Sequence, residues 1–122
     1  MIKVFFLKTL TMAIVMFLIT EVTSAASFDC SRSQTFVEKT ICSVPELSYL
    51  DELMANNYWA MRGANIGDGA MDDLMSTQRE WLATRDQCEN VDCLLDQYLQ
   101  RIEQICMYPV IKGVFPDCRE AY

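Results

Sequence analysis

Residues 35–63 read TFVEKTICSVPELSYLDELMANNYWAMRG, and this segment decides the fold class because it contains two helix starts. Thr35 and Glu38 have the spacing of a capping box, in which each side chain accepts a hydrogen bond from a backbone N–H at the start of a helix. Pro45 marks the second start, since the N–H that proline lacks has no helical partner in a first turn. We expect this second helix to run from about Pro45 to Gly63.

Apolar periodicity predicts the longer helices, and no alternating strand pattern is present. The second helix repeats its apolar residues at steps of three and four, at Leu47, Leu50, Met54, Tyr58 and Met61. Glycines at 63, 67 and 69 then interrupt the pattern. A third helix is expected from about Ala70 to Asp86 and a fourth from about Val91 to Cys106. We therefore predict an all-α fold, a small antiparallel bundle of three to four helices in which consecutive helices are neighbours.

Residues 1–26 have the features of a secretory signal peptide. Lys3 and Lys8 supply the positive start, an apolar run follows, and small residues precede an expected cleavage after Ala26. A membrane anchor is the alternative, but Lys8 interrupts the apolar stretch, and a spanning helix needs roughly 20 apolar residues. We expect export with a cleaved leader, and one domain over residues 27–122.

The chain after the leader is strongly acidic. When Lys3, Lys8 and Glu21 are removed from the chain's 10 basic and 17 acidic residues, 8 basic and 16 acidic remain, and the formal net charge is −8. This charge argues against nucleic acid and anionic membranes as partners. A basic protein is a natural partner, because opposite fields speed encounter, although acidity also serves solubility alone.

The chain has six cysteines and no histidine. An even number of cysteines in a short exported chain is typical of a disulfide-stapled fold. Without histidine there is no Ser-His or Cys-His dyad. On the predicted helices Cys106 and Cys118 fall at one bundle end, so we expect them to pair and anchor a C-terminal tail. The other four fall at the opposite end, where local pairing is favoured over crosswise pairing. The local pairs are Cys30–Cys42 and Cys88–Cys93.

No motif predicts catalysis or metal binding. Asp68 with Asp72, and Asp92 with Asp96, are four residues apart, so each pair shares a helix face. Each pair also lies in a first helical turn, where acids interact favourably with the helix dipole. The glycine-rich loop lacks the spaced oxygen ligands of an EF-hand. We therefore expect no enzyme activity, no cofactor and no metal.

Three groups of short segments occur in order along the chain. They are FDC (28–30) with VEKTIC (37–42); PEL (45–47) with LD (50–51); and QREWL (78–82), RDQC (85–88), CL (93–94), Tyr98 and RI (101–102). Together they resemble the LprI-type lysozyme inhibitor family. The resemblance covers about residues 28–102 and leaves out the cysteine-anchored tail. It implies a small, exported, disulfide-bonded helical inhibitor domain from bacteria that binds and blocks a lysozyme-type muramidase.

The matched residues are of the kind that maintain a fold, so they do not locate an inhibitory surface. A lysozyme cleft uses a pair of carboxyl groups on the sugar, which an arginine or amide on a projecting loop would satisfy. Arg62, Asn65 and Asp68 lie on or beside the glycine-rich loop, and Trp59 lies off the apolar stripe of its helix. We expect these four residues to form the inhibitory contact.

The expected partner is a lysozyme-like muramidase or toxin domain in the periplasm. Two biological versions fit, namely defence against a foreign lysozyme and immunity against a type VI secretion effector. The sequence does not decide between a monomer and a homodimer. No membrane partner is expected after signal cleavage. The alternative is a small-ligand carrier or a structural periplasmic helical protein. The six-cysteine helical odorant-binding proteins are such carriers, but they have two cysteines three residues apart, a spacing that this chain lacks.

Overall fold

The computed structural model describes residues 26–122, so the predicted signal peptide lies outside the described residues except for Ala26. The elements of the described chain are a 3-10 helix, η1 (Cys30–Arg32), and the helices α1 (Phe36–Ser43), α2 (Pro45–Gly63), α3 (Asp68–Arg85) and α4 (Val91–Cys106). Within these residues there is no strand, and the predicted all-α fold is confirmed. None of the described helices is long and apolar enough to cross a bilayer.

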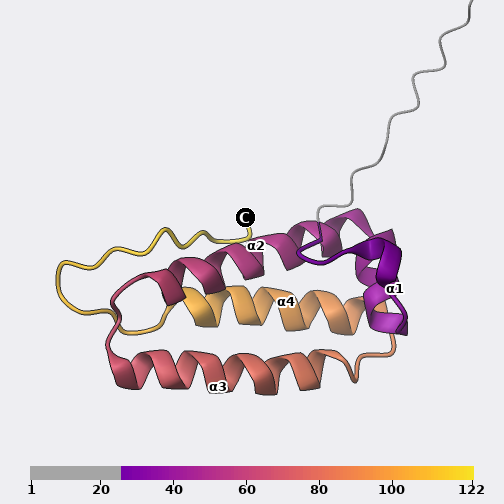
Figure 1. Cartoon of the computed structure of the whole chain (residues 1–122). Coiled ribbons are helices and arrows are strands. Elements are labelled where there is room, and N and C mark those ends of the chain that lie inside the picture. Colours follow the sequence, from indigo (N-terminus) through magenta and orange to yellow (C-terminus); the bar gives the residue numbers. More distant parts are fainter. Residues whose placement is uncertain (1–25) are drawn as a thin grey trace, which may run out of the picture.

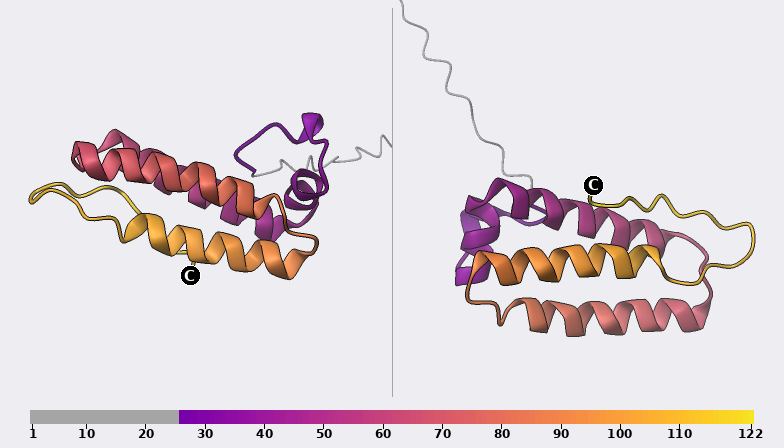
Figure 2. Two further views of the ribbon diagram at one scale, coloured as in Figure 1. Left: turned by 90° about the horizontal axis from the view of Figure 1, so that it is seen from below. Right: turned by 180° about the vertical axis from the view of Figure 1, so that it is seen from behind.

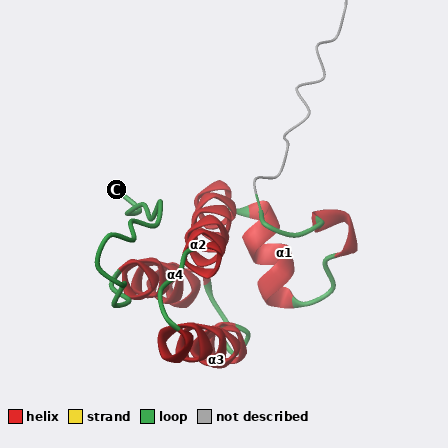
Figure 3. Ribbon diagram, turned by 60° about the vertical axis from the view of Figure 1, so that its left-hand side comes forward, coloured by secondary structure: helices red, strands yellow, loops and turns green. Residues whose placement is uncertain are grey.

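Helices α2, α3 and α4 form the bundle, and α1 lies across one of its ends (Figure 1). α4 packs against both other helices, runs parallel to α2 and runs antiparallel to α3 (Figures 1 and 2). Consecutive helices are antiparallel as predicted, but α2 and α3 diverge instead of packing closely (Figure 3). α4 takes the central place in the bundle, and its apolar stripe is buried along its whole length. That stripe consists of Leu94, Tyr98, Ile102 and Ile105.

Local capping fixes where the helices begin. The Thr35 hydroxyl accepts a hydrogen bond from the Glu38 N–H, and the Glu38 carboxylate accepts one from the Thr35 N–H, both at 3.1 Å. The predicted capping box is therefore confirmed. Pro45 lies in the first turn of α2 as expected. At the start of α4, the Asn90 Oδ1 atom accepts from the Cys93 N–H at 2.9 Å.

The buried face of α2 is wider than the predicted stripe. Tyr58 is only half-buried, whereas the rest of that stripe is buried. Four further buried residues of α2 are Ser48, Asp51, Leu53 and Asn57. The face is wide because α2 meets α1, α4 and the tail, whereas α3 buries mainly Leu74, Gln78 and Trp81. Trp81 meets Tyr98 edge-on, with 5.2 Å between the ring centres.

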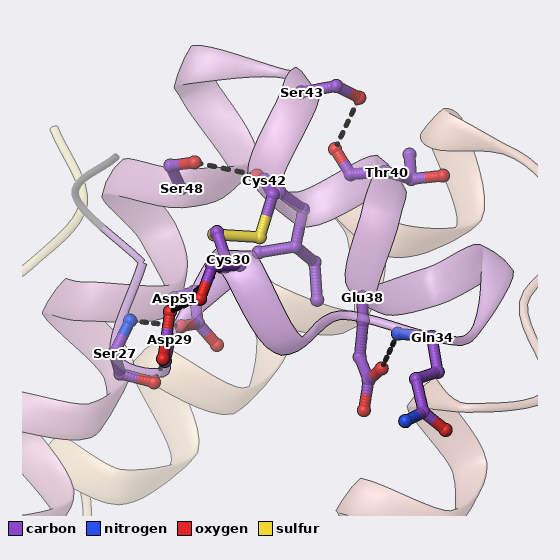
Figure 4. Close-up of a disulfide and its surroundings, with 12 residues drawn as sticks. Ser27, Asp29, Cys30, Gln34, Glu38, Thr40, Cys42, Ser43, Ser48 and Asp51 are labelled. Carbon is purple, nitrogen blue, oxygen red and sulfur yellow. Dashed lines mark hydrogen bonds between the residues drawn. A yellow bond between two sulfur atoms is a disulfide. The ribbon is translucent and has the colours of Figure 1, made fainter. Parts of the chain in front are cut away.

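The cysteines pair locally, as favoured from the sequence. The three disulfides are Cys30–Cys42 between η1 and α1, Cys88–Cys93 across the α3–α4 turn, and Cys106–Cys118 between α4 and the tail. No cysteine of the described chain is free. Figure 4 shows the first of these bridges beside α2. Three disulfides in a chain of this size indicate an oxidising compartment.

The C-terminal tail is irregular, yet it is held against α2. It runs past the end of the bundle, turns, and returns along α2 (Figure 1; Figure 2, right). The buried Asn57 amide binds both sides of one tail peptide unit. Its Nδ2 donates to the Arg119 carbonyl at 2.7 Å, and its Oδ1 accepts from the Arg119 N–H at 3.0 Å. The Tyr49 hydroxyl donates to the Ala121 carbonyl at 3.4 Å. The tail is therefore an integral part of the domain.

Candidate functional site

Three residues in the last turns of α2 form an aromatic–arginine cluster, consisting of Tyr58, Trp59 and Arg62. The Arg62 guanidinium carbon lies 5.3 Å from the centre of the Trp59 ring and 5.9 Å from that of Tyr58. Trp59 is 61% exposed, so the cluster lies at the surface. Cation–π contacts of this geometry hold a guanidinium in a defined position. The structure thus brings together two of the four predicted contact residues, Trp59 and Arg62.

The Arg62 guanidinium has no acidic partner within residues 26–122. The ion pairs of the described chain involve Arg85, and the Nε atom of Arg62 is buried without a hydrogen-bond partner there. The other basic residues of the described chain, Arg85 excepted, also lack an ion-pair partner, so Arg62 is distinguished by this unsatisfied Nε atom and by its position over two aromatic rings. A guanidinium binds a carboxylate through two parallel hydrogen bonds. Arg62 is therefore suited to bind a carboxylate of another molecule.

The loop between α2 and α3 is shorter than expected. It consists of residues 64–67, because α3 begins at Asp68 instead of about Ala70. Gly67 has a φ of +94°, which glycine adopts without strain, and this turns the chain directly into α3. Ile66 is buried and anchors the loop to the core. The loop is therefore a tight, anchored turn.

Asn65 and Asp68 are the other two predicted contact residues; Asn65 lies within this turn, Asp68 directly follows it, and both are exposed. No hydrogen bond or ion pair of the described chain joins either of them to the aromatic–arginine cluster. Asp68 is the first residue of α3 and lies in its first turn, as predicted. These two residues thus share one end of the bundle with the cluster without being part of it.

A second loop at the same end of the bundle was not predicted to contribute to the site. This stapled loop, residues 106–118, is closed by the Cys106–Cys118 disulfide and projects beyond the helices (Figures 1 and 2). Its large exposed apolar side chains are Met107, Val110, Ile111 and Phe115, of which Phe115 is 90% exposed. Clustered exposed apolar residues mark a docking surface. The sequence feature that could have indicated this surface is the mostly apolar segment 107–115, which follows no helical pattern.

The stapled loop also lies beside the α2–α3 turn. A methyl group in place of a hydrogen on Gly67 would lie 3.8 Å from the Ile111 Cδ1 atom, which is van der Waals contact. The turn therefore links the stapled loop to the segment that contains Asn65. One end of the bundle thus presents apolar side chains on the loop and polar side chains on the turn.

A groove of about 330 Å³ separates α2 from α3 where the two helices diverge. It connects the aromatic–arginine cluster with a buried polar network nearer α1. Its walls include Met54, Tyr58 and Trp59 of α2, Met75, Arg79, Leu82 and Arg85 of α3, and Ser27 and Asp51. A second hollow, of about 620 Å³, lies between α4 and the tail and is lined by Leu99, Ile102, Glu103, Cys106, Met107, Glu120 and Ala121.

The buried polar network consists of Asp51, Tyr98 and Arg85, one residue from each bundle helix. The Tyr98 hydroxyl donates to the Asp51 Oδ1 atom at 2.6 Å and accepts from the Arg85 Nη1 atom at 3.1 Å. Burial and the nearby Asp51 charge raise the pKa of Tyr98, so the phenol stays protonated and can donate. Arg85 also forms an ion pair with Asp86 at 2.7 Å.

All three residues of the network, together with Asp86, belong to the segments on which the resemblance rests. In this chain the network connects the three bundle helices to one another, and the carboxylate of Asp51 is 1% exposed. These segments therefore maintain the fold, and the candidate contact surface lies at the other end of the groove.

Comparison with protein-family models, with curated proteins and with solved structures finds no match for this chain. The class that the structure itself defines is a small, disulfide-stapled, all-α bundle. Its candidate contact surface is formed by the aromatic–arginine cluster, the α2–α3 turn and the stapled loop.

Proposed function

We propose that this protein is an exported, periplasmic inhibitor of a lysozyme-like muramidase and that it occludes the catalytic cleft of the enzyme. The observation that carries the proposal is the Arg62 guanidinium, which is held over two aromatic rings and has no acidic partner in the described chain. The resemblance to the LprI-type inhibitors supplies the class of enzyme. The surface supplies the means of binding it.

The chemistry of a muramidase cleft matches that arginine. Most glycoside hydrolases place two carboxyl groups on either side of the scissile bond. The Arg62 guanidinium would bind one of them through two hydrogen bonds, while the exposed Trp59 ring would shield the pair from water. The excess of acidic residues would attract a basic enzyme and speed its encounter with the inhibitor.

The stapled loop would supply apolar contact area beside this polar anchor. Its disulfide restricts its conformation before binding, and Ile111 of the loop lies beside the α2–α3 turn. A loop held in its bound conformation loses less entropy on association than a flexible one. Asn65 and Asp68 would lie at the polar edge between the two elements. This division into an anchor and a surrounding contact area is common in protein interfaces.

The test is a titration of several purified muramidases, including any that is encoded beside this gene, with the oxidised protein lacking its leader. We expect stoichiometric loss of cell-wall hydrolysis with at least one of them. Arg62→Ala should weaken that inhibition at least about 10-fold, because truncating a central arginine anchor typically costs more than about 1.4 kcal/mol. Asn65→Ala should have a smaller effect in the same direction.

Arg32→Ala is the matched control. Arg32 is an exposed arginine on η1, near the opposite end of the bundle, and its loss should leave inhibition unchanged. If the wild-type protein neither inhibits nor binds any of these enzymes, the proposal is wrong. If Arg62→Ala and Arg32→Ala inhibit equally well, the contact surface lies elsewhere on the bundle.

The proposed function has two biological forms that genomic position would separate. An immunity protein is encoded next to its toxin, so a neighbouring gene for a type VI effector with a muramidase domain would favour immunity. Defence against a foreign lysozyme predicts no such neighbour, together with inhibition of enzymes from other organisms. Both forms use the same contact surface.

A further inference from the structure

Asp51 is a buried carboxylate that binds Ser27, the first residue of the expected mature domain. Its Oδ2 atom accepts hydrogen bonds from the Ser27 backbone N–H at 2.7 Å and from the Ser27 hydroxyl at 2.6 Å (Figure 4). Its Oδ1 atom accepts the bond from Tyr98. Both oxygens are therefore satisfied by hydrogen bonds. A buried carboxylate also needs a compensating positive charge.

Arg85 supplies only part of that charge. Its Nη1 atom lies 3.9 Å from the Asp51 Oδ1 atom, whereas its Nη2 atom lies 2.7 Å from Asp86. Two charged or titratable groups lie directly against the Asp51 carboxylate, Arg85 of α3 and Tyr98 of α4. Further out lie Asp86, the residue after α3, which pairs with Arg85; Arg79 of α3, which lines the same groove; and Glu38 of α1, which interacts with Arg85. The Arg85 guanidinium is shared between Asp51 and Asp86 and lies closer to Asp86, so the buried Asp51 carboxylate is only partly neutralised.

The missing charge would arise at the atom that already contacts Asp51. Ser24 and Ala26 supply small residues at the third and first positions before Ser27, which is the pattern of a leader-peptidase cleavage site. Hydrolysis of the Ala26–Ser27 bond adds one water molecule. The leader then ends in the carboxylate of Ala26, and the Ser27 nitrogen becomes a primary amine. Such an amine has an ordinary pKa of about 7.7–8.0, so it is protonated at neutral pH.

We propose that the leader is cut at the Ala26–Ser27 bond and that the new Ser27 ammonium is the cation that neutralises Asp51. The inference rests on the export that the proposed function assumes. The amide N–H of the uncut chain makes the same hydrogen bond without the charge. Cleavage therefore converts a hydrogen bond into a buried ion pair that fastens the start of the domain to α2, close to the Cys30–Cys42 bridge (Figure 4).

The first measurement is the intact mass of the protein after export from bacterial cells. The proposal predicts a chain that begins at Ser27. A mature chain that begins at any other residue would overturn it.

The second measurement uses three forms prepared in vitro, which makes it independent of export and of any muramidase. One form begins at Ser27, the second retains Ala26, and the third carries an acetylated Ser27 amine. At pH 6.5 we expect the first to unfold at least about 4 °C above the other two, which is the shift that about 1 kcal/mol of added stability produces in a domain of this size. Equal unfolding temperatures would overturn the proposal.

The pH dependence has a defined sign. Pairing with Asp51 should raise the pKa of the amine in the folded protein above 8, as measured by NMR titration. The added stability should be complete below the unfolded pKa of about 8 and should disappear as the pH rises through the folded value. In Asp51→Asn the three forms should unfold at the same temperature. If that variant does not fold, the pKa of the Ser27 amine in the folded wild-type protein tests the proposal by itself. A value of 8 or below would contradict an ion pair between Ser27 and Asp51.

Discussion

The Asn57 side chain provides a test of how the tail is held, because it makes two hydrogen bonds to one tail residue. Asn57→Ala removes the bonds to the Arg119 carbonyl and the Arg119 N–H, at 2.7 and 3.0 Å. Each such bond contributes about 1 kcal/mol net. Asn57 is fully buried, so its truncation also leaves a small cavity. We expect the free energy of unfolding to fall by about 2–3 kcal/mol.

Denaturant unfolding followed by circular dichroism would measure this loss, and hydrogen exchange would locate it. The Arg119 amide should exchange slowly in the wild-type protein and rapidly in Asn57→Ala. Asn56→Ala is the control, because Asn56 is the exposed neighbour on the same helix and its loss should change stability by less than about 0.5 kcal/mol. Equal stability of the two variants, or unchanged protection of the Arg119 amide, would refute this account of the tail.

Two further predictions concern the staple and the buried network. Replacing both Cys106 and Cys118 by serine should lower the free energy of unfolding by about 3 kcal/mol in the chain-entropy model. It should also weaken inhibition, because the loop between them is freed; thermal unfolding and the hydrolysis titration would measure the two effects. Tyr98→Phe should cost about 2 kcal/mol, since it removes a donor to the buried Asp51. The pKa of Tyr98 is raised by burial and by Asp51. The contribution of Tyr98 to the free energy of unfolding is therefore fully present below about pH 10 and is lost as the pH rises further, because the tyrosine then ionises in the unfolded chain. This part of the alkaline fall in stability should be missing in Tyr98→Phe, and identical pH profiles would contradict the assignment.

The helices themselves were predictable because their ends carry local signals. The capping box at Thr35 and the proline at 45 determine α1 and α2 through contacts within a few residues. α3 begins earlier than predicted because Gly67 turns directly into the helix, so that glycine acts as a boundary and not as part of a long loop. The position of α4 between α2 and α3 depends on packing among distant segments.

The candidate site was harder to predict because its parts lie far apart in the sequence. Helical spacing placed Trp59 off the apolar stripe, but its contact with Arg62 in the surface cluster was not predicted. Gly67 and Ile111 lie close together although they are more than 40 positions apart in the sequence, and no local pattern predicts this proximity. Buried polar residues were missed for the same reason. Arg101 is 2% exposed and is stabilised by a hydrogen bond to Gln78 at 2.9 Å, a partner on another helix.

The central claim is that the protein occupies the catalytic cleft of a muramidase, and a competition experiment tests it most directly. Inhibition of an identified target would be measured at increasing concentrations of a soluble cell-wall oligosaccharide that fills the cleft. Occlusion predicts that the oligosaccharide displaces the protein and that the two never bind together. A ternary complex, with inhibition unchanged by the oligosaccharide, would contradict the account.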